Sequence, residues 1–207
     1  MQRSAAHRKW QFMSGKLRSI CVFCGAHSGT NPAFEASARA VGHHLAENGI
    51  RLVTGGGSLG LMGAVADGCI EAGGEMVGVI TTYLEKRELA HPGASRMDVT
   101  ENMLARKKRM AELSDAFISL PGGIGTLDEL FEMLTWSRLQ EHDKPSGLLN
   151  VDGFYDELIS FCCRTQVEAG FITAEDAGNL IHSDNLSELL KKLAVAAEHG
   201  PSSLYRN

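Results

Sequence analysis

The sequence has no excess of positive charge and no apolar run long enough to cross a bilayer. Its 25 aspartate and glutamate residues outnumber its 20 lysine and arginine residues, which gives a formal net charge of −5. A nucleic-acid surface needs a basic patch or stripe, so this balance argues against nucleic acid as a partner, although a local basic site is still possible. A membrane-spanning helix needs about 20 consecutive apolar residues, so we expect no membrane anchor.

Cysteine is scarce and odd in number. The five cysteines are Cys21, Cys24, Cys69, Cys162 and Cys163. This usage favours a reducing compartment, the cytoplasm, over a disulfide framework. Cys21 and Cys24 have CxxC spacing, which leaves zinc or redox use open, but their apolar surroundings favour small buried hydrophobic residues. Because no cluster of histidine, cysteine and aspartate has metal-ligand spacing, the sequence predicts no metal and no cofactor.

The pattern that is present is an alternation of short β-rich apolar runs with helical patterns. The predicted strands are 20–23, 51–54, 76–80, 116–120 and 147–150, and the predicted helices are 33–48, 59–73, 101–113, 126–140, 153–169 and 184–198. Such alternation is typical of one parallel sheet covered on both faces. We therefore expect one α/β domain over residues 17–200. Residues 1–16 are basic but lack the apolar core of a secretory signal, and we interpret them as a flexible tail.

Three segments follow predicted strands and mark the expected position of a site. They are 24–30, 55–60 and 121–126. Ligands of parallel sheets bind beyond the carboxyl ends of the strands, so these segments should converge on one composite site. We expect the segment 81–100 to be a longer irregular crossover that forms a lid or a pocket wall.

The glycine loop at 55–60 (GGGSLG) satisfies G-x-G-x-x-G between a strand and a helix. A dinucleotide site also needs an acid at the end of the next strand, and that strand ends in Thr81-Thr82, which disfavours a dinucleotide. The candidate contacts here are Gly56, Gly57 and Ser58, with a tight turn made of small residues as an equally good explanation. Neither glycine loop is followed by a Walker lysine, so NTP hydrolysis is disfavoured.

The second glycine loop, PGGIGTLDE at 121–129, is the most informative motif. It predicts a glycine turn that opens a helix with acids in its first turn, and the N-terminus of such a helix suits a phosphate. Thr126-x-x-Glu129 can also be read as a capping box with no role in binding. Capping needs one residue before the helix rather than three glycines, so the glycine density favours a ligand.

A basic cluster lies in the predicted helix 101–113. Met103, Arg106 and Met110 share one helical face, which places a guanidinium along an apolar stripe. Such a group needs a partner, and either a substrate oxygen or a buried ion pair with Glu129 or Glu88 would provide one.

These motifs together resemble a known family. PGGIGTLDE with Met103-x-x-Arg106-Lys107 resembles the paired signature of the "lonely guy" (LOG) family, cytokinin riboside 5′-monophosphate phosphoribohydrolases that are often mislabelled lysine decarboxylases. The resemblance extends from about residue 19 to residue 172 and includes VFCG at 22–25, GGGS at 55–58 and GLMG at 60–63. It implies a single-domain, Rossmann-like, doubly wound parallel sheet with helices on both faces. It also implies a homodimer or higher homo-oligomer with sites near the dimer interface.

The resemblance also assigns roles to residues of this chain. Arg106 and Glu129 are implied to be catalytic. The implied substrate contacts are Glu88, Lys107, Gly122, Gly123, Gly125, Thr126, Asp128 and Thr135. Ile124, Asp128 and the pair Ala26-His27 depart from the family's usual residues, which bears on substrate preference.

The implied reaction is hydrolysis of the N-glycosidic bond of an adenine-type nucleoside 5′-monophosphate, AMP or an N6-prenylated relative, to free base and ribose 5-phosphate. Departure of the base leaves positive charge on the ribose. Glu129 would stabilise that charge and activate water, while the loop amides hold the phosphate. Arg106 would either bind substrate oxygens or assist the departing base, and the sequence leaves both open.

Two other classes of protein are alternatives. A non-catalytic carrier of a nucleotide or cofactor would need the glycine loops but not the pair Arg106 and Glu129. A decarboxylase would need a pyridoxal-binding lysine, and no lysine of the sequence lies in a glycine-rich or strand-end context.

Overall fold

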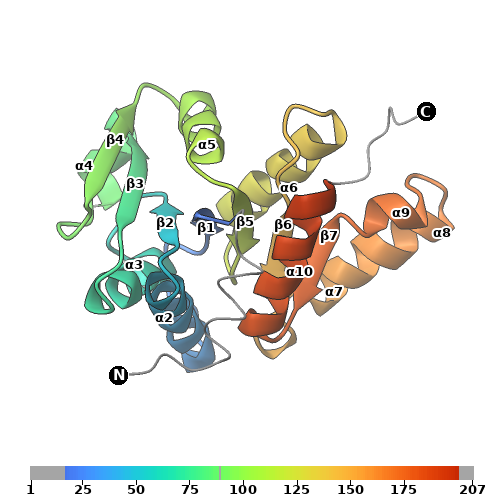
Figure 1. Ribbon diagram of the computed structural model, residues 1–207, viewed down its shortest axis with the longest axis horizontal. Helices are drawn as coiled ribbons and strands as arrows, with labels where there is room; N and C mark the ends of the chain where they lie inside the picture. Colours follow the sequence, from blue (N-terminus) through green and yellow to red (C-terminus); the bar gives the residue numbers. More distant parts are fainter. Residues whose placement is uncertain (1–16, 89, 201–207) are drawn as a thin grey trace.

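The computed structural model describes residues 17–88 and 90–200, with the side chain of Glu88 outside the described part. Within these residues, seven parallel strands form one sheet with the order β4-β3-β2-β1-β5-β6-β7 (Figure 1). The strands are β1 Ser19–Phe23, β2 Arg51–Thr54, β3 Met76–Thr81, β4 Arg96–Thr100, β5 Ala116–Ser119, β6 Ser146–Leu149 and β7 Leu180–Ser183. The predicted tail, residues 1–16, lies outside the described residues.

Helices connect successive strands. They are α2 Pro32–Glu47, α3 Gly60–Glu71, α4 Thr82–Glu88, α5 Met103–Glu112, α6 Ile124–Arg138, α7 Asp156–Ser160, α8 Gln166–Glu168, α9 Ala174–Ala177 and α10 Leu186–His199. A short 3₁₀ turn, Val151–Gly153, precedes α7, and a π-helical turn, Phe161–Thr165, joins α7 to α8.

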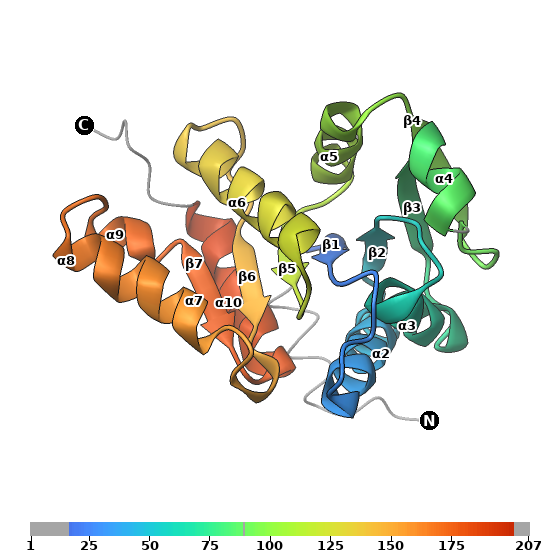
Figure 2. The ribbon, with the colours of Figure 1, turned by 180° about the vertical axis from the view of Figure 1, so that it is seen from behind.

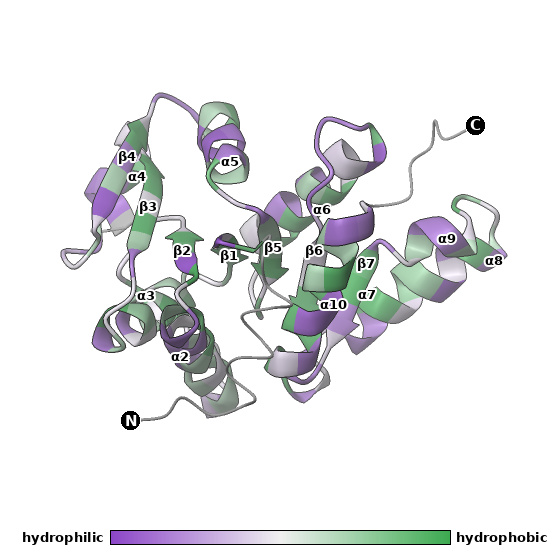
Figure 3. Ribbon diagram, viewed as in Figure 1, coloured by the Kyte–Doolittle hydropathy of each residue, from purple (hydrophilic) through white to green (hydrophobic). Residues whose placement is uncertain are grey.

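The two faces of the sheet carry separate cores because successive strand residues point in opposite directions. On one face, Ile20 and Val22 of β1 pack in a cluster with residues of α2, α3 and α10. On the other face, Cys21 and Phe23 pack with residues of α5 and α6. Figures 2 and 3 show helices on both faces of the sheet and the apolar strands between them. The fold is therefore the predicted α/β, Rossmann-like, doubly wound sheet.

The strand order reverses between β1 and β5, and this reversal positions the site. From β1 the chain builds outward through β2, β3 and β4, and it then returns to place β5 on the other side of β1. The last residues of the two strands, Phe23 and Ser119, are paired in register. The loops that follow them therefore emerge side by side, at the point where open α/β sheets bind their ligands.

The five predicted strands are confirmed, but two edge strands were missed. The prediction of an irregular crossover over 81–100 is wrong, because this segment contains α4 and most of it is regular up to the end of β4. β4 (RMDVT) is largely polar and partly exposed, so it lacks the apolar run that marks a buried strand. β7 has only four residues, LIHS, so its pattern of apolar and polar residues is too short to be recognised as a strand.

The cysteines are free thiols, and Cys21, Cys24, Cys69 and Cys162 are buried, as the apolar surroundings predicted. In the part of the chain that the structure describes, no cluster of histidine, cysteine and acidic residues has the arrangement of a metal site. None of the helices found there has both the length and the apolarity needed to cross a membrane.

Candidate active site

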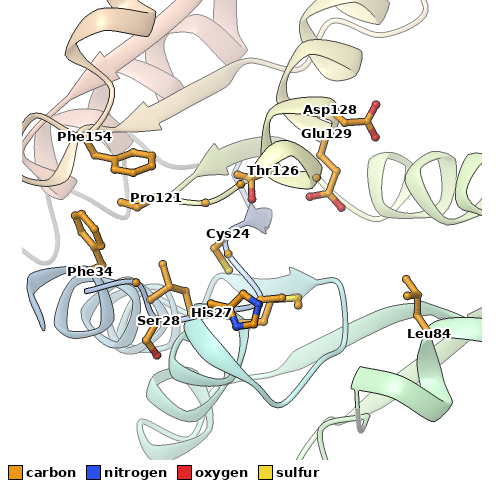
Figure 4. Close-up of a pocket in the computed structure, with 18 of the residues that line it drawn as sticks. Cys24, His27, Ser28, Phe34, Leu84, Pro121, Thr126, Asp128, Glu129 and Phe154 are labelled. Atoms are coloured by element: carbon orange, nitrogen blue, oxygen red, sulfur yellow. The ribbon is translucent and has the colours of Figure 1, made fainter. Parts of the chain in front are cut away.

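A cavity of about 510 Å³ lies at the carboxyl ends of β1 and β5. The turn after β1 contributes its lining residues 24–29, and the loop after β5 contributes Pro121, Gly122, Gly123 and Gly125. Figure 4 shows Phe34 and Phe154 at one end of this cavity and Glu129 and Leu84 toward the other. Two of the three segments predicted to converge, 24–30 and 121–126, therefore meet here.

The glycine loop leads directly into helix α6. Gly123 is the N-cap of α6, no side chain caps the helix, and the helix begins at Ile124. Thr126 therefore lies inside the first turn and is not the N-cap, so the capping-box interpretation is wrong. The first N–H groups of a helix lack intrahelical partners and lie at its positive end. This end of α6 faces the cavity and is suited to an anion.

The acids of α6 lie in its second turn, not in the first turn as predicted. Glu129 is buried, and Figure 4 shows its carboxylate on the side of the helix that faces the cavity. The neighbouring Asp128 points away from Glu129 in the same view, and its side chain is 54% exposed. One turn of helix thus separates a phosphate-sized cradle from a buried carboxylate.

Arg106 is held against Glu129 by several contacts. Its Nη1 lies 3.4 Å from Glu129 Oε1, and only 5% of the residue is exposed. Its Nε donates to the Val79 carbonyl at 2.9 Å, and its Nη2 donates to the Gly55 carbonyl at 3.3 Å. The predicted ion pair between Arg106 and Glu129 is therefore present, and it lies in the wall of the cavity.

Gly55 has a packing role that explains the first residue of the GGGS motif. A Cβ atom at this position would lie 2.1 Å from Arg106 Nη2. Only glycine leaves room there for the guanidinium.

The glycine loop is tied to its surroundings by two further hydrogen bonds. The Tyr155 hydroxyl donates to the Leu120 carbonyl at 2.6 Å, immediately before the loop. The Gly25 N–H donates to the Pro121 carbonyl at 3.0 Å, which joins the loop to the turn after β1. These contacts fix the two sides of the cavity relative to each other.

Some predicted contact residues do not line the cavity. The Lys107 ammonium pairs with Asp128 at 2.9 Å and with Glu132 at 2.7 Å. Burial lowers the pKa of Lys107, but the hydrogen bonds to these two carboxylates outweigh it, so the pKa is raised overall. Thr135 is exposed on α6, two turns beyond the loop. The backbone of Glu88 ends α4, and its side chain is not described.

The residues of the first glycine loop also lie outside the cavity lining. Gly56 packs against Gly78 and Met97, and Gly57 forms a bridge with Ala90. The next residue, Ser58, packs against Gly63. A Cβ atom built at Gly63 would lie 2.2 Å from the Ser58 carbonyl oxygen. The alternative explanation of a tight turn therefore describes Gly56 and Gly57 in this structure.

The structure adds lining residues that had no individual prediction. Phe34 and Phe154 meet edge to face, with ring centroids 5.4 Å apart, and both line the cavity. Phe34 belongs to α2 and Phe154 follows the 3₁₀ turn, so no sequence spacing connects them. His27 lies in a segment that was expected at the site, and its departure from the family's usual residues had linked it to substrate preference, although no contact had been assigned to it.

Among the described residues, Cys24 is the one cysteine in the cavity wall, and its thiol is not activated. Burial raises the pKa of Cys24 well above the usual range, and the Glu129 carboxylate raises it further. The thiol therefore stays protonated at neutral pH and is a poor nucleophile.

Comparison with known proteins gives one family and several relatives. A family model described as "possible lysine decarboxylase" matches residues 62–193. The chain is 44% identical to a probable cytokinin riboside 5′-monophosphate phosphoribohydrolase of Oryza sativa subsp. japonica (LOGL1), over 86% of this chain and 80% of the relative. It is also 44% identical to a cytokinin riboside 5′-monophosphate phosphoribohydrolase of Arabidopsis thaliana (LOG3), over 86% of this chain and 82% of that one.

Solved structures agree on the fold. A molybdenum cofactor binding protein of Rippkaea orientalis superposes with a TM-score of 0.64 at 24% identity and covers 84% of this chain and 96% of its own. A molybdenum cofactor carrier protein of Chlamydomonas reinhardtii gives a TM-score of 0.66 at 23% identity, over 89% and 99% of the two chains. At these identities the likeness concerns the fold alone.

Proposed function

Because the chain belongs to the LOG family of cytokinin riboside 5′-monophosphate phosphoribohydrolases, we propose that it is an N-glycosyl hydrolase. Its substrate is an adenine-type nucleoside 5′-monophosphate, either AMP or an N6-prenylated relative, and its products are the free base and ribose 5-phosphate. The observation that carries this proposal is the ion pair between Arg106 and Glu129, at 3.4 Å, in a cavity wall one helical turn from a glycine loop.

The phosphate binds at the N-terminal end of α6 in this proposal. Gly122, Gly123 and Gly125 line the cavity there. Apart from the chain neighbours and the nearby backbone of α6 itself, no atom of a described residue lies within 4 Å of a Cβ built at Gly123 or Gly125. This open space lets a phosphate approach the backbone N–H groups closely. Anchoring the phosphate places the ribose beside the second turn of α6, where Glu129 faces the cavity.

In the reaction, water attacks C1′ of the ribose while the bond from C1′ to the base breaks. The bonding electron pair leaves with the base, which takes up a proton, and the hydroxyl of the water remains on C1′. Glu129 stabilises the positive charge that develops on the ribose and accepts the proton of the attacking water. Arg106 offsets the cost of burying this carboxylate and fixes its orientation, since two backbone carbonyls hold the guanidinium in place.

A decarboxylase mechanism has less support from the site. Pyridoxal chemistry requires a lysine that can form a Schiff base. Among the described residues that line the cavity there is no lysine. The ammonium of Lys107, next to Arg106, is paired with two carboxylates.

The protein acts as a homodimer or a higher homo-oligomer in this proposal. Ile124, Asp128, Phe131, Thr135 and Leu139 recur every three or four residues and form one exposed stripe along α6. Ile124 is 82% exposed and Phe131 is 39% exposed, so this one helix face presents large apolar side chains to solvent, and an exposed apolar face of this kind is typical of interaction sites. A second copy packed on this stripe would bury them and would bring Asp128 and Thr135 near a substrate.

We also place the enzyme in the cytoplasm, because its five cysteines are free thiols and four of them are buried in the core.

Incubation of the purified protein with AMP and, separately, with N6-isopentenyl-AMP tests the function. Chromatography should resolve equal amounts of free base and ribose 5-phosphate, and the ratio of the two rates gives the substrate preference. Saturable nucleotide binding without any base release would contradict the proposal and favour a carrier.

A further inference from the structure

Resting on the proposed function, we propose that the imidazole ring of His27 donates a hydrogen bond to the 5′-phosphate of the substrate from the side of the cavity opposite the glycine loop. His27 is thereby a specificity-determining residue that favours nucleotides over nucleosides.

The position of His27 is the first support. His27 lies in the turn after β1 and lines the cavity. Figure 4 shows its ring, together with Ser28, on the side of the cavity across from Pro121 and Thr126. A phosphate at the N-terminal end of α6 would therefore have the glycine loop on one side and the imidazole on the other.

The backbone of this turn is fixed, so the imidazole is presented from a defined place. The Gly25 N–H donates to the Pro121 carbonyl at 3.0 Å, and the Gly25 carbonyl accepts from the Leu61 N–H at 3.1 Å. Gly60 has a φ of +57°, and a Cβ atom built at Gly60 would lie 2.5 Å from the backbone nitrogen of His27. The turn is thus clamped between the glycine loop and the start of α3.

The charge balance of the cavity is the second support. The charged groups in its wall are Arg106, Asp128 and Glu129. Arg106 already donates to two carbonyls and pairs with Glu129. The nearby Lys107 is paired with Asp128 and Glu132. A phosphate that binds beside Glu129 therefore needs a hydrogen-bond donor that is not already engaged.

His27 can supply that donor. Its imidazole makes no hydrogen bond or ion pair with any residue in 17–88 or 90–200, so it is available to a ligand. The other groups that α2, α3 and α4 turn toward the cavity are apolar, namely Phe34, Leu61, Met62 and Leu84. The ring N–H of His27 is therefore a donor in the described cavity wall that is free to bind a phosphate.

The test compares binding of ribose 5-phosphate to the wild type, His27→Ala and His27→Gln by calorimetry. His182→Gln is the matched control, because His182 is an exposed histidine on the edge strand β7 and does not line the cavity. We expect His27→Ala to bind about tenfold more weakly, as expected for the loss of one hydrogen bond to a charged phosphate.

Adenosine, which has no phosphate, should bind equally to the wild type and His27→Ala. In turnover of AMP, the substitution should raise KM and leave kcat within about twofold, the pattern of lost ground-state binding. His27→Gln keeps an N–H donor at this position, so it should lose less affinity than His27→Ala.

Wild-type affinity of His27→Ala for ribose 5-phosphate would overturn the role of His27, as would an equal loss of adenosine binding. Either result, with base release intact, would leave the proposed hydrolysis standing. A phosphate-specific loss of affinity in a protein that releases no base would support the role of His27 and reject the hydrolysis.

Discussion

Arg106 illustrates how a single buried charge can be accommodated beside a reaction centre. Its guanidinium is almost fully buried, and backbone carbonyls of two different strand ends accept from it. Removing one partner of such a buried pair leaves an uncompensated charge and commonly costs 3–5 kcal/mol, about a third of the stability of a domain. Substitutions of either partner therefore test stability and chemistry together, so the free energy of unfolding has to be measured beside the activity of each variant.

At the residue scale, the sequence predicted the charged partner of Arg106 but not the backbone carbonyls that accept its other hydrogen bonds. The shared face of Met103, Arg106 and Met110 indicated a guanidinium in need of a partner, and Glu129 was one of the partners expected. The carbonyls of Val79 and Gly55 could not be predicted, because backbone acceptors carry no sequence signal and depend on how β2 and β3 are placed.

His142 should make the stability of the protein depend on pH. Burial and the Lys144 cation lower the pKa of His142 to about 4, and its ring lies 5.4 Å from that of Phe117. In the unfolded chain histidine has a pKa of about 6.5, so the unfolded state binds more protons between these values. Stability should therefore be fully present above about pH 6.5 and should decrease as the pH falls toward about 4.

The measurement is the urea midpoint of the wild type and of His142→Phe at several pH values in this window. The substitution removes the titrating group from an aromatic environment, so the variant should lose less stability than the wild type on acidification. Parallel curves for the two proteins would contradict this explanation.

At the element scale, the start of α6 offers two glycines with opposite expected behaviour. A Cβ at Gly122 would lie 2.1 Å from Thr126 Oγ1 and 2.9 Å from the Gly25 backbone nitrogen. A Cβ at Gly125 would meet no described atom within 4 Å apart from its chain neighbours and the nearby backbone of α6. We expect Gly122→Ala to lower the free energy of unfolding by about 1–3 kcal/mol, the usual cost of overpacking. Gly125→Ala should leave it unchanged or raise it by less than about 1 kcal/mol.

Gly125→Ala, which should leave stability almost unchanged, should impair nucleotide binding. Its added methyl group would occupy the space that the phosphate needs, so KM for the nucleotide should rise about tenfold, which corresponds to about 1.4 kcal/mol. Chemical denaturation and steady-state kinetics on both variants check the pair. An unchanged KM for Gly125→Ala would argue against phosphate binding at this end of α6.

The elements that the sequence predicted are those with a strong apolar signal. Strands β1, β2, β3, β5 and β6 are central and buried, so each appears as a run of apolar residues. Strands β4 and β7 form the edges of the sheet, and their partly exposed residues remove that signal. The capping box failed for a different reason: Thr126-x-x-Glu129 fits the pattern, but glycine at 123 can start the helix three residues earlier.

At the scale of the whole molecule, the exposed stripe of α6 predicts self-association. Light scattering should give at least the mass of a dimer for the wild type. Ile124→Glu with Phe131→Glu should shift the protein toward the monomer, because two charges would then be buried in an apolar interface. Phe171→Glu is the matched control, since Phe171 is 82% exposed and lies outside the stripe; it should leave the mass unchanged.

A wild-type protein that is monomeric at micromolar concentration, or a double variant that keeps the wild-type mass, would contradict this interface. The same double variant should also release base more slowly if a second copy completes the site.

The position of the site followed from the topology, which the sequence also predicted. Alternating strands and helices indicated a doubly wound sheet, and ligands of such sheets bind at strand carboxyl ends. The sequence could not show where the strand order reverses, so all three glycine-containing segments were expected to converge on the site. The reversal between β1 and β5 selects the turn after β1 and the loop after β5, and it leaves Gly56 and Gly57 to pack against β3 and β4.

The most direct test of the central claim is base release from AMP by Glu129→Gln, measured beside nucleotide binding by the same protein. Glutamine keeps the size of the buried side chain but cannot accept the proton of water. The account predicts nucleotide affinity within a few-fold of wild type and a decrease in kcat of about 10²-fold or more, the usual contribution of a general base. A variant that binds AMP and keeps most of the wild-type rate would contradict the catalytic role of Glu129.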